Sequence, residues 1–263
     1  MKTFGKQWKD RIRNGETVIG GHIFLPNPSM AEAMVSFGFE YLWIDGEHGH
    51  FDKDAFYNHI VAVNGAGGGV FVRVTTGEPF LIKPVLEMGP DGIVFPMICT
   101  ALEAKTAMDA CIYPPGGSRG FGPRRASRYG TISDAEYLES INECLVKIIQ
   151  IEHIDGVNNL NAILDIKGID GIVIGPYDLS YSLGLPGRLK HPDFFACCKK
   201  IFDICKSRGV PCGVSTGYVD DEYMQFMIDQ KINFIFCGDD LAFIKAGVTQ
   251  TIKNVKNGIA RRK

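Results

Sequence analysis

Two carboxylates, Glu152 and Asp178, stand just beyond two short apolar runs of the sequence. The runs, 146–151 and 171–174, have the composition of buried strands, and a helix-like segment at 155–167 separates them. A strand–helix–strand unit with a right-handed crossover has parallel strands, so both acids are expected at the same edge of a sheet. Ligands bind at that edge in parallel α/β proteins. Two carboxylates there suit a hard divalent cation with open coordination positions.

Each acid also has a simpler explanation, which is that it caps the helix after its strand. Asp178 suits that role, whereas a glutamate such as Glu152 is a poorer N-cap residue than aspartate, serine or threonine. No lysine or arginine adjoins either acid in the sequence. The pattern therefore favours a shared metal site over two separate caps.

Three further residues with reactive side chains follow other apolar runs. Asp45 and His48 come directly after a run at 41–44, close enough for the carboxylate to hold one imidazole tautomer, as a general base requires. The alternative is a turn aspartate and a loop histidine satisfied by backbone. Arg73 lies inside the run VFVRV. Burying a guanidinium unpaired costs several kcal/mol, so Arg73 needs an anionic partner or an anionic substrate.

Eight strand-like runs alternate with helical segments along the whole chain. The runs lie at 17–24, 41–44, 70–74, 92–96, 146–151, 171–174, 210–214 and 232–237. Helices are expected at 5–16, 29–37, 52–64, 78–88, 101–110, 133–144, 155–167, 192–207, 220–230 and from about Asp239, and the longest irregular stretch at 113–131. Many runs are apolar throughout, as strands covered on both faces are. The pattern predicts a single (β/α)8 barrel domain over residues 1–263.

A doubly wound sheet is the competing fold, but the segment FLPNPS after the first run lacks the glycine-rich turn of that fold.

The net charge of −2 gives no electrostatic case for nucleic acid or membrane surfaces. No apolar run approaches the roughly 18 residues that span a bilayer. Eight cysteines are scattered without metal-ligand spacing, which is typical of thiols in a reducing cytoplasm. We therefore expect a soluble cytoplasmic protein with no nucleic acid or membrane partner.

The positions of the lysines argue against Schiff-base chemistry, which needs a lysine near the carboxyl end of a strand. Lys147 and Lys231 fall at strand starts, and Lys83 lies in a helix. A phosphate site is disfavoured because the last strand ends in two aspartates. The chemistry expected is metal-assisted, on an unphosphorylated substrate with a carboxylate. The irregular stretch also carries four arginines, at 119, 124, 125 and 128. Three roles are open for them: binding a second substrate carboxylate, contacting another subunit, or lying in solvent.

Five spaced motifs resemble the HpcH/HpaI aldolase family of class II pyruvate aldolases. They are WIDGEHGHFD, VRV with EPFLIKPVLEMGPDGIVFPM, YPPGGSRGFGPRRAS, IIQIE and IGPYDLSYSLG, in unbroken order over nearly the whole chain. The resemblance implies a barrel of the phosphoenolpyruvate/pyruvate type, usually hexameric. It also implies a divalent cation such as Mg²⁺, Mn²⁺ or Co²⁺, with a 2-oxo acid and an aldehyde as small-molecule partners.

The resemblance assigns roles to residues of this chain. It makes Glu152 and Asp178 the metal ligands and Arg73 the group that binds and stabilises a pyruvate enolate. It makes His48 the acid/base residue, with Asp45 orienting it. It also implies that backbone at Gly175, Pro176, Tyr177 and Asp178 holds the pyruvate carboxylate, and that Glu87 is an acid reaching a neighbouring subunit.

The activity implied is cleavage of a 4-hydroxy-2-oxo acid to pyruvate and an aldehyde through a metal-stabilised enolate. An oxaloacetate decarboxylase or macrophomate-synthase-like lyase is the alternative, because FLPNPS and FGPRRA resemble those relatives. A barrel that binds a keto acid without turnover is a third possibility. His22 stands where bacterial aldolases of the family commonly carry tryptophan, so the aldehyde pocket departs from the family pattern.

Overall fold

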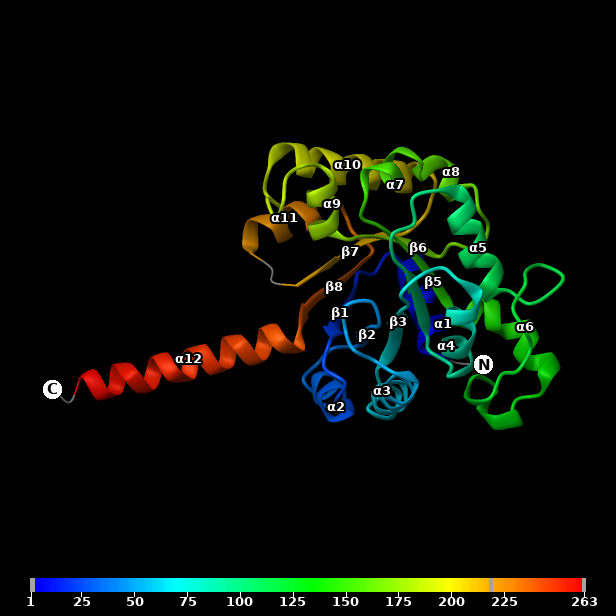
Figure 1. The fold of residues 1–263 in the computed structure, drawn as a ribbon, viewed down its shortest axis with the longest axis horizontal. Helices are drawn as coiled ribbons and strands as arrows, with labels where there is room; N and C mark the ends of the chain where they lie inside the picture. Colours follow the sequence, from blue (N-terminus) through cyan, green and yellow to red (C-terminus); the bar gives the residue numbers. More distant parts are fainter. Residues whose placement is uncertain (1–2, 218–219, 262–263) are drawn as a thin grey trace.

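The computed structural model describes residues 3–217 and 220–261. Its eight strands are all parallel and close into a barrel in chain order, which confirms the predicted (β/α)8 fold (Figure 1). They are β1 (Val18–Ile23), β2 (Tyr41–Asp45), β3 (Gly69–Arg73), β4 (Gly92–Phe95), β5 (Val146–Ile151), β6 (Gly171–Ile174), β7 (Cys212–Thr216) and β8 (Phe234–Asp239).

Helices lie between successive strands and cover most of the outside of the barrel (Figure 1). They are α1 (Phe4–Arg13), α2 (Pro28–Ser36), α3 (Lys53–Gly65), α4 (Pro79–Glu87), α5 (Ala101–Cys111), the 3-10 segment η1 (Arg125–Gly130), α6 (Asp134–Cys144), α7 (Ile154–Asn158), α8 (Leu160–Leu164), α9 (Pro176–Ser182), α10 (Pro192–Ser207), α11 (Asp221–Asp229) and α12 (Asp240–Ala260).

The helical layer differs from the sequence prediction in two places near the fifth and sixth strands. The helix expected at 155–167 is two short helices, α7 and α8, which meet at Asn159. No helix was predicted between the run at 171–174 and the helix at 192–207, but α9 begins directly after β6, with Gly175 as its N-cap and Pro176 in its first turn. The fixed φ of proline is already helical, and its missing N–H is not needed in a first turn. Asp178 is thus part of that first turn.

Aromatic rings fill the inside of the barrel, and α1 closes its amino-terminal end. Trp8 of α1 is buried, with its ring 5.9 Å from Phe71 and 5.1 Å from Phe234. Gly213 makes room for this packing, since a Cβ there would lie 2.5 Å from the Phe234 ring. One end of the barrel is therefore sealed by a hydrophobic plug, and the other, at the carboxyl ends of the strands, is left for ligands.

Helix α12 leaves the barrel after β8 and extends away from the body of the molecule (Figure 1). It is 21 residues long, and none of the helices in the described ranges is long and apolar enough to cross a membrane. Its exposed apolar residues include Leu241, Ile244, Val248, Ile252, Val255 and Ile259, which we call the α12 stripe. Their spacing of three and four residues places them on one face of the helix.

Candidate active site

A cavity of about 360 Å³ opens at the carboxyl ends of the strands. It gathers the predicted site residues Asp45, His48, Arg73, Gly175, Pro176, Tyr177 and Asp178, and adds His22, Phe24, Gln150, Ser215, Gly217 and Asp239. The parallel strands bring these residues together because each lies near or just beyond the carboxyl end of a strand.

Arg73 is the cationic centre of the cavity. It is 6% exposed, and its Nε donates to Asp45 Oδ1 at 3.0 Å while Nη2 donates to the other oxygen of that carboxylate. Its Nη1 lies 2.9 Å from Glu47 Oε2 and 3.4 Å from Gln150 Oε1. The bidentate contact holds the guanidinium plane in one orientation. The sequence-based expectation that Arg73 needs an anionic partner is met by two carboxylates of the chain itself.

Asp45 has a different partner from the one expected. Its Oδ1 accepts from the backbone N–H groups of Glu47 at 3.0 Å and His48 at 3.1 Å, and the rest of the carboxylate faces Arg73. The expected hydrogen bond from Asp45 to the His48 ring is not among the contacts of the described residues. Asp45 therefore shapes the loop that carries His48 and positions Arg73, while His48 itself is exposed at the cavity.

Glu152 is a buried carboxylate beside the cavity, only 2% exposed. Its Oε1 accepts from the backbone N–H of Met97 at 2.9 Å, and its Oε2 accepts from the Gln150 amide. Burial raises the pKa of Glu152 to about 8, and the negative charges of Glu47 and Asp178 act in the same direction. Without a cation, this carboxylate is costly to keep charged at neutral pH.

The backbone at Gly175 packs directly against this carboxylate. A Cβ at Gly175 would lie 2.5 Å from Glu152 Oε2 and 2.6 Å from Gln150 Nε2, so only glycine allows the start of α9 to come this close. That approach carries Asp178, in the first turn of α9, towards the end of β5. The two predicted metal ligands are thus near enough to repel one another electrostatically.

The donor chemistry of these residues fits a divalent cation. Two carboxylate groups suit a hard cation, and a cation would offset the burial and the charge repulsion that raise the pKa of Glu152. In residues 3–217 and 220–261, no cluster of three or more histidine, cysteine, aspartate or glutamate side chains is arranged to hold a metal. Glu152 and Asp178 alone would supply two acidic ligands, which would leave coordination positions for substrate and water.

Sequence reasoning missed Gln150 and gave Glu47 no role. Gln150 is 2% exposed, lines the cavity and connects Arg73 to Glu152 through its amide. The signal for it was strand alternation, since it lies two residues before Glu152 in a run whose only other polar residue, Lys147, stands near its start. Glu47 contributes the second carboxylate against Arg73.

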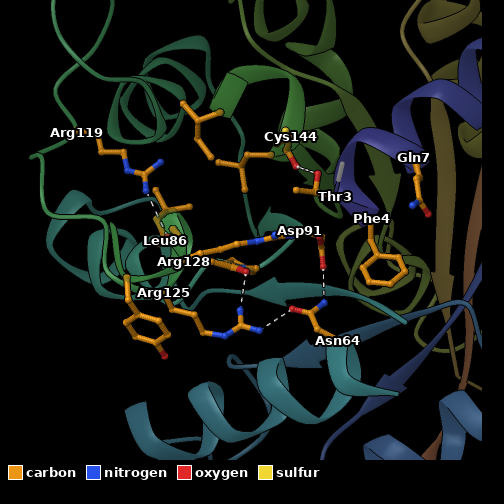
Figure 2. Close-up of a pocket in the computed structure, with 16 residues that line it drawn as sticks. Thr3, Phe4, Gln7, Asn64, Leu86, Asp91, Arg119, Arg125, Arg128 and Cys144 are labelled. Carbon is orange, nitrogen blue, oxygen red and sulfur yellow. Dashed lines mark hydrogen bonds between the residues drawn. The ribbon is translucent and has the colours of Figure 1, made fainter. Parts of the chain in front are cut away.

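The four loop arginines do not line this cavity. Arg119, Arg125 and Arg128 instead line a second cavity of about 480 Å³ beside residues that precede strands β3, β4 and β5, at the opposite end of the barrel. Figure 2 shows Arg125 bonded to Asn64, which in turn donates to Asp91. Within one chain, these arginines cannot supply the second carboxylate contact that was one of their expected roles.

Two other residues lie outside the cavity. Glu87 ends α4, and its carboxylate lies beside Gly122, 3.0 Å from the position that a Cβ there would take. Its expected contact with a neighbouring subunit stays a prediction. Lys147 lies at the amino-terminal end of β5 and pairs with Asp170 at 3.1 Å. None of the cavity-lining side chains in the described part of the chain is a lysine. This arrangement agrees with the sequence argument against a Schiff base.

The sequence pattern of the HpcH/HpaI aldolase/citrate lyase family matches residues 20–244, which include the carboxyl ends of all eight strands. The chain belongs to this family. It is accordingly an enzyme, an aldolase-type carbon–carbon lyase.

Named members of the HpcH/HpaI family are similar over nearly their whole length. A hydroxypyruvate/pyruvate aldolase of Roseobacter denitrificans is 35% identical over 239 residues, covering 90% of this chain and 92% of the relative. A 2-keto-3-deoxy-L-rhamnonate aldolase of Escherichia coli strain K12 is 33% identical, covering 95% and 93%. The crystal structure of an HpcH/HpaI aldolase/citrate lyase family protein from Burkholderia cenocepacia J2315 matches with a TM-score of 0.89 at 29% identity, covering 95% and 99%.

Proposed function

We propose that this HpcH/HpaI enzyme is a divalent-metal-dependent aldolase that cleaves a 4-hydroxy-2-oxo acid to pyruvate and an aldehyde. One observation carries the proposal: a buried guanidinium, Arg73, lines the cavity, and Gln150 joins it to a buried carboxylate, Glu152, beside the cavity. A small keto acid between them would meet a fixed positive charge on one side and a cation site on the other. The name of the Roseobacter denitrificans relative, a hydroxypyruvate/pyruvate aldolase, supports pyruvate as the product.

Glu152 and Asp178 would hold the cation, which is Mg²⁺, Mn²⁺ or Co²⁺ in this proposal. A divalent cation supplies Lewis-acid polarisation of a keto acid, which makes its neighbouring carbon more acidic. Two features support this assignment. Glu152 is a buried carboxylate that a cation would neutralise, and Gly175 allows the start of α9 to approach that carboxylate closely. The raised pKa of Glu152 supports it as well.

The chain's own groups perform the remaining steps. Arg73 donates to the oxyanion of the enolate, in an orientation preset by Asp45 and Glu47. Backbone at Gly175, Pro176, Tyr177 and Asp178 holds the pyruvate carboxylate at the start of α9. His48, exposed at the cavity, takes the proton from the C4 hydroxyl during cleavage and returns it during addition.

The test is proton exchange on pyruvate, which needs no knowledge of the aldehyde. In D₂O the methyl protons of pyruvate should exchange at least about 100-fold faster with Mg²⁺ or Mn²⁺ than with a chelator. Proton NMR of the methyl signal measures the rate. Exchange that is equally fast in the presence of the chelator would contradict metal dependence. No exchange with Mg²⁺, Mn²⁺ or Co²⁺, each added separately, would contradict pyruvate enolate formation.

We further propose that the enzyme is a homo-oligomer in which α12 packs on a second copy of the chain; the hexamer expected from the family is one such assembly. In a regular barrel the helix after β8 covers β8 and β1, but α12 extends away (Figure 1). Ile19, on the outer face of β1, is consequently 50% exposed. A two-fold exchange of helices would bury the α12 stripe of each copy against the other.

Aspartates at Val248 and Ile252, in the middle of the α12 stripe, should break this assembly. The double variant Val248→Asp/Ile252→Asp is expected to sediment as smaller species, approaching the 29.0 kDa monomer, because charges cannot be buried in an apolar contact without a partner. Gln250→Asp, a change on the same helix outside the stripe, is the control and should keep the wild-type mass. A wild-type enzyme that sediments as a monomer would rule out the proposal.

A further inference from the structure

One wall of the catalytic cavity has polar groups that the proposed mechanism does not use. His22 of β1, Ser215 of β7 and Asp239 of β8 line it. These strands are consecutive in the closed barrel, since β8 pairs with both β7 and β1. The groups for the keto acid and the cation come from the other arc, which runs from β2 to the start of α9. The aldehyde half of the substrate therefore has this wall beside it.

His22 is held in one protonation state by its partners. It is 4% exposed, with Nδ1 lying 2.9 Å from the carbonyl oxygen of Gly238 and Nε2 2.8 Å from Ser215 Oγ. A carbonyl oxygen only accepts, so Nδ1 carries the proton. Burial lowers the pKa of His22, so the ring is neutral near pH 7 and Nε2 has a free lone pair. Nε2 consequently accepts from the Ser215 hydroxyl.

This arrangement makes the wall a set of hydrogen-bond acceptors. Because the Ser215 proton is committed to His22, the oxygen of Ser215 offers the cavity only lone pairs. Asp239 Oδ1 accepts from the backbone N–H of Ala242 at 2.7 Å, and Oδ2 is the acceptor left for the cavity. Two acceptors, one of them a carboxylate, suit a ligand that donates hydrogen bonds and carries no negative charge.

We propose that Ser215 and Asp239 bind the aldehyde, with His22 as a positioning residue, and that they select a neutral aldehyde bearing a hydroxyl group next to its carbonyl. This inference rests on the proposed aldolase function and specifies its electrophile. In the addition direction pyruvate loses one methyl proton, its C3 bonds to the aldehyde carbon, and the aldehyde oxygen gains one proton. Glycolaldehyde would give 4,5-dihydroxy-2-oxopentanoate. An apolar aldehyde leaves the acceptors unpaired, and glyoxylate brings a second negative charge beside Asp239.

The experiment compares three aldehydes that differ in one group: glycolaldehyde, acetaldehyde and glyoxylate. Each is added to pyruvate and the metal-loaded enzyme, and kcat/KM is measured for carbon–carbon bond formation. The ratio of glycolaldehyde to acetaldehyde should fall about tenfold in Ser215→Ala, since a site built for a hydroxyl discriminates through that contact. The two aldehydes differ in intrinsic reactivity, but this difference is the same for wild type and variant and cancels when their ratios are compared. His22→Phe should lower the same ratio, because it frees the Ser215 proton.

Asp239→Asn gives an independent readout. Asparagine still accepts from the Ala242 N–H as an N-cap residue, so α12 keeps its start. The variant should use glyoxylate about tenfold better, relative to glycolaldehyde, because the like charge is removed. Ser140→Ala, the same serine-to-alanine change on α6 outside the cavity, is the matched control and should leave both ratios at their wild-type values.

The outcomes separate this inference from the function on which it rests. A wild-type enzyme that exchanges pyruvate protons, but whose two ratios are unchanged by Ser215→Ala and Asp239→Asn, would overturn the inference and leave the aldolase proposal standing. A wild-type enzyme that exchanges no pyruvate protons would overturn both. Lowered glycolaldehyde preference in Ser215→Ala together with improved glyoxylate use in Asp239→Asn would establish the wall as the aldehyde site.

Discussion

Glu152→Gln is expected to lower metal-dependent pyruvate exchange by about 10³-fold or more while the barrel stays folded, because the substitution removes one of the two proposed acidic ligands. Glutamine has nearly the same size and can still accept from the Met97 N–H, so the buried site keeps its packing. Isothermal titration with Mn²⁺ measures the loss of affinity, and circular dichroism measures the fold. Glu139→Gln, the same change on the exposed face of α6, should bind Mn²⁺ like wild type.

The pH dependence of binding gives a second signature of Glu152. Since burial raises the pKa of this residue to about 8 without a cation, Mn²⁺ must displace a proton below that pH. Wild-type affinity should then rise about tenfold per pH unit from pH 6 towards 8. In Glu152→Gln this rise should disappear, because the amide has no proton to release. Full activity and unchanged Mn²⁺ affinity in the variant would end the metal assignment.

Replacement of Arg73 should have the largest combined effect on stability and activity. Arg73→Ala leaves Asp45 buried and Glu47 half-buried without their cation, which costs about 3–5 kcal/mol of unfolding free energy. Arg73→Lys keeps a charge but loses the bidentate contact with Asp45, and its exchange rate should fall about 10²- to 10³-fold. Urea denaturation measures the first effect and proton NMR the second.

A double variant separates the two roles of Arg73. In Arg73→Ala/Asp45→Asn the buried negative charge is removed with its partner, so part of the lost stability should return. Activity should not return, since the group that donates to the enolate oxyanion is still missing. If Arg73→Ala and the double variant have equal unfolding free energies, the stability lost in Arg73→Ala does not come from leaving Asp45 without its cation.

The sequence by itself determined the fold and the end of the barrel at which the candidate site lies. Apolar runs that end in Asp45, Glu152 or Asp178 predict parallel strands with functional groups at their carboxyl ends, and the structure has eight such strands in chain order. The prediction works because a parallel barrel sends every strand end to the same mouth. This prediction does not require knowing which side chains contact one another.

Only the tertiary structure decided which side chains meet. Asp45 and Arg73 are register partners on β2 and β3, so the carboxylate faces the guanidinium, and its hydrogen bond with His48 is to the backbone N–H and not to the ring. Register depends on how two strands slide past each other, and the sequence of one strand does not contain it.

The other features that the tertiary structure decided have the same cause. Gln150 joins Arg73 to Glu152, and barrel closure brings His22 beside Ser215, 193 residues away in the sequence. The path of α12 was also absent from the sequence pattern, because its apolar stripe is the same whether the helix covers its own barrel or leaves it. Contacts between residues far apart in the chain are set by packing, and local patterns record only which face of an element is apolar.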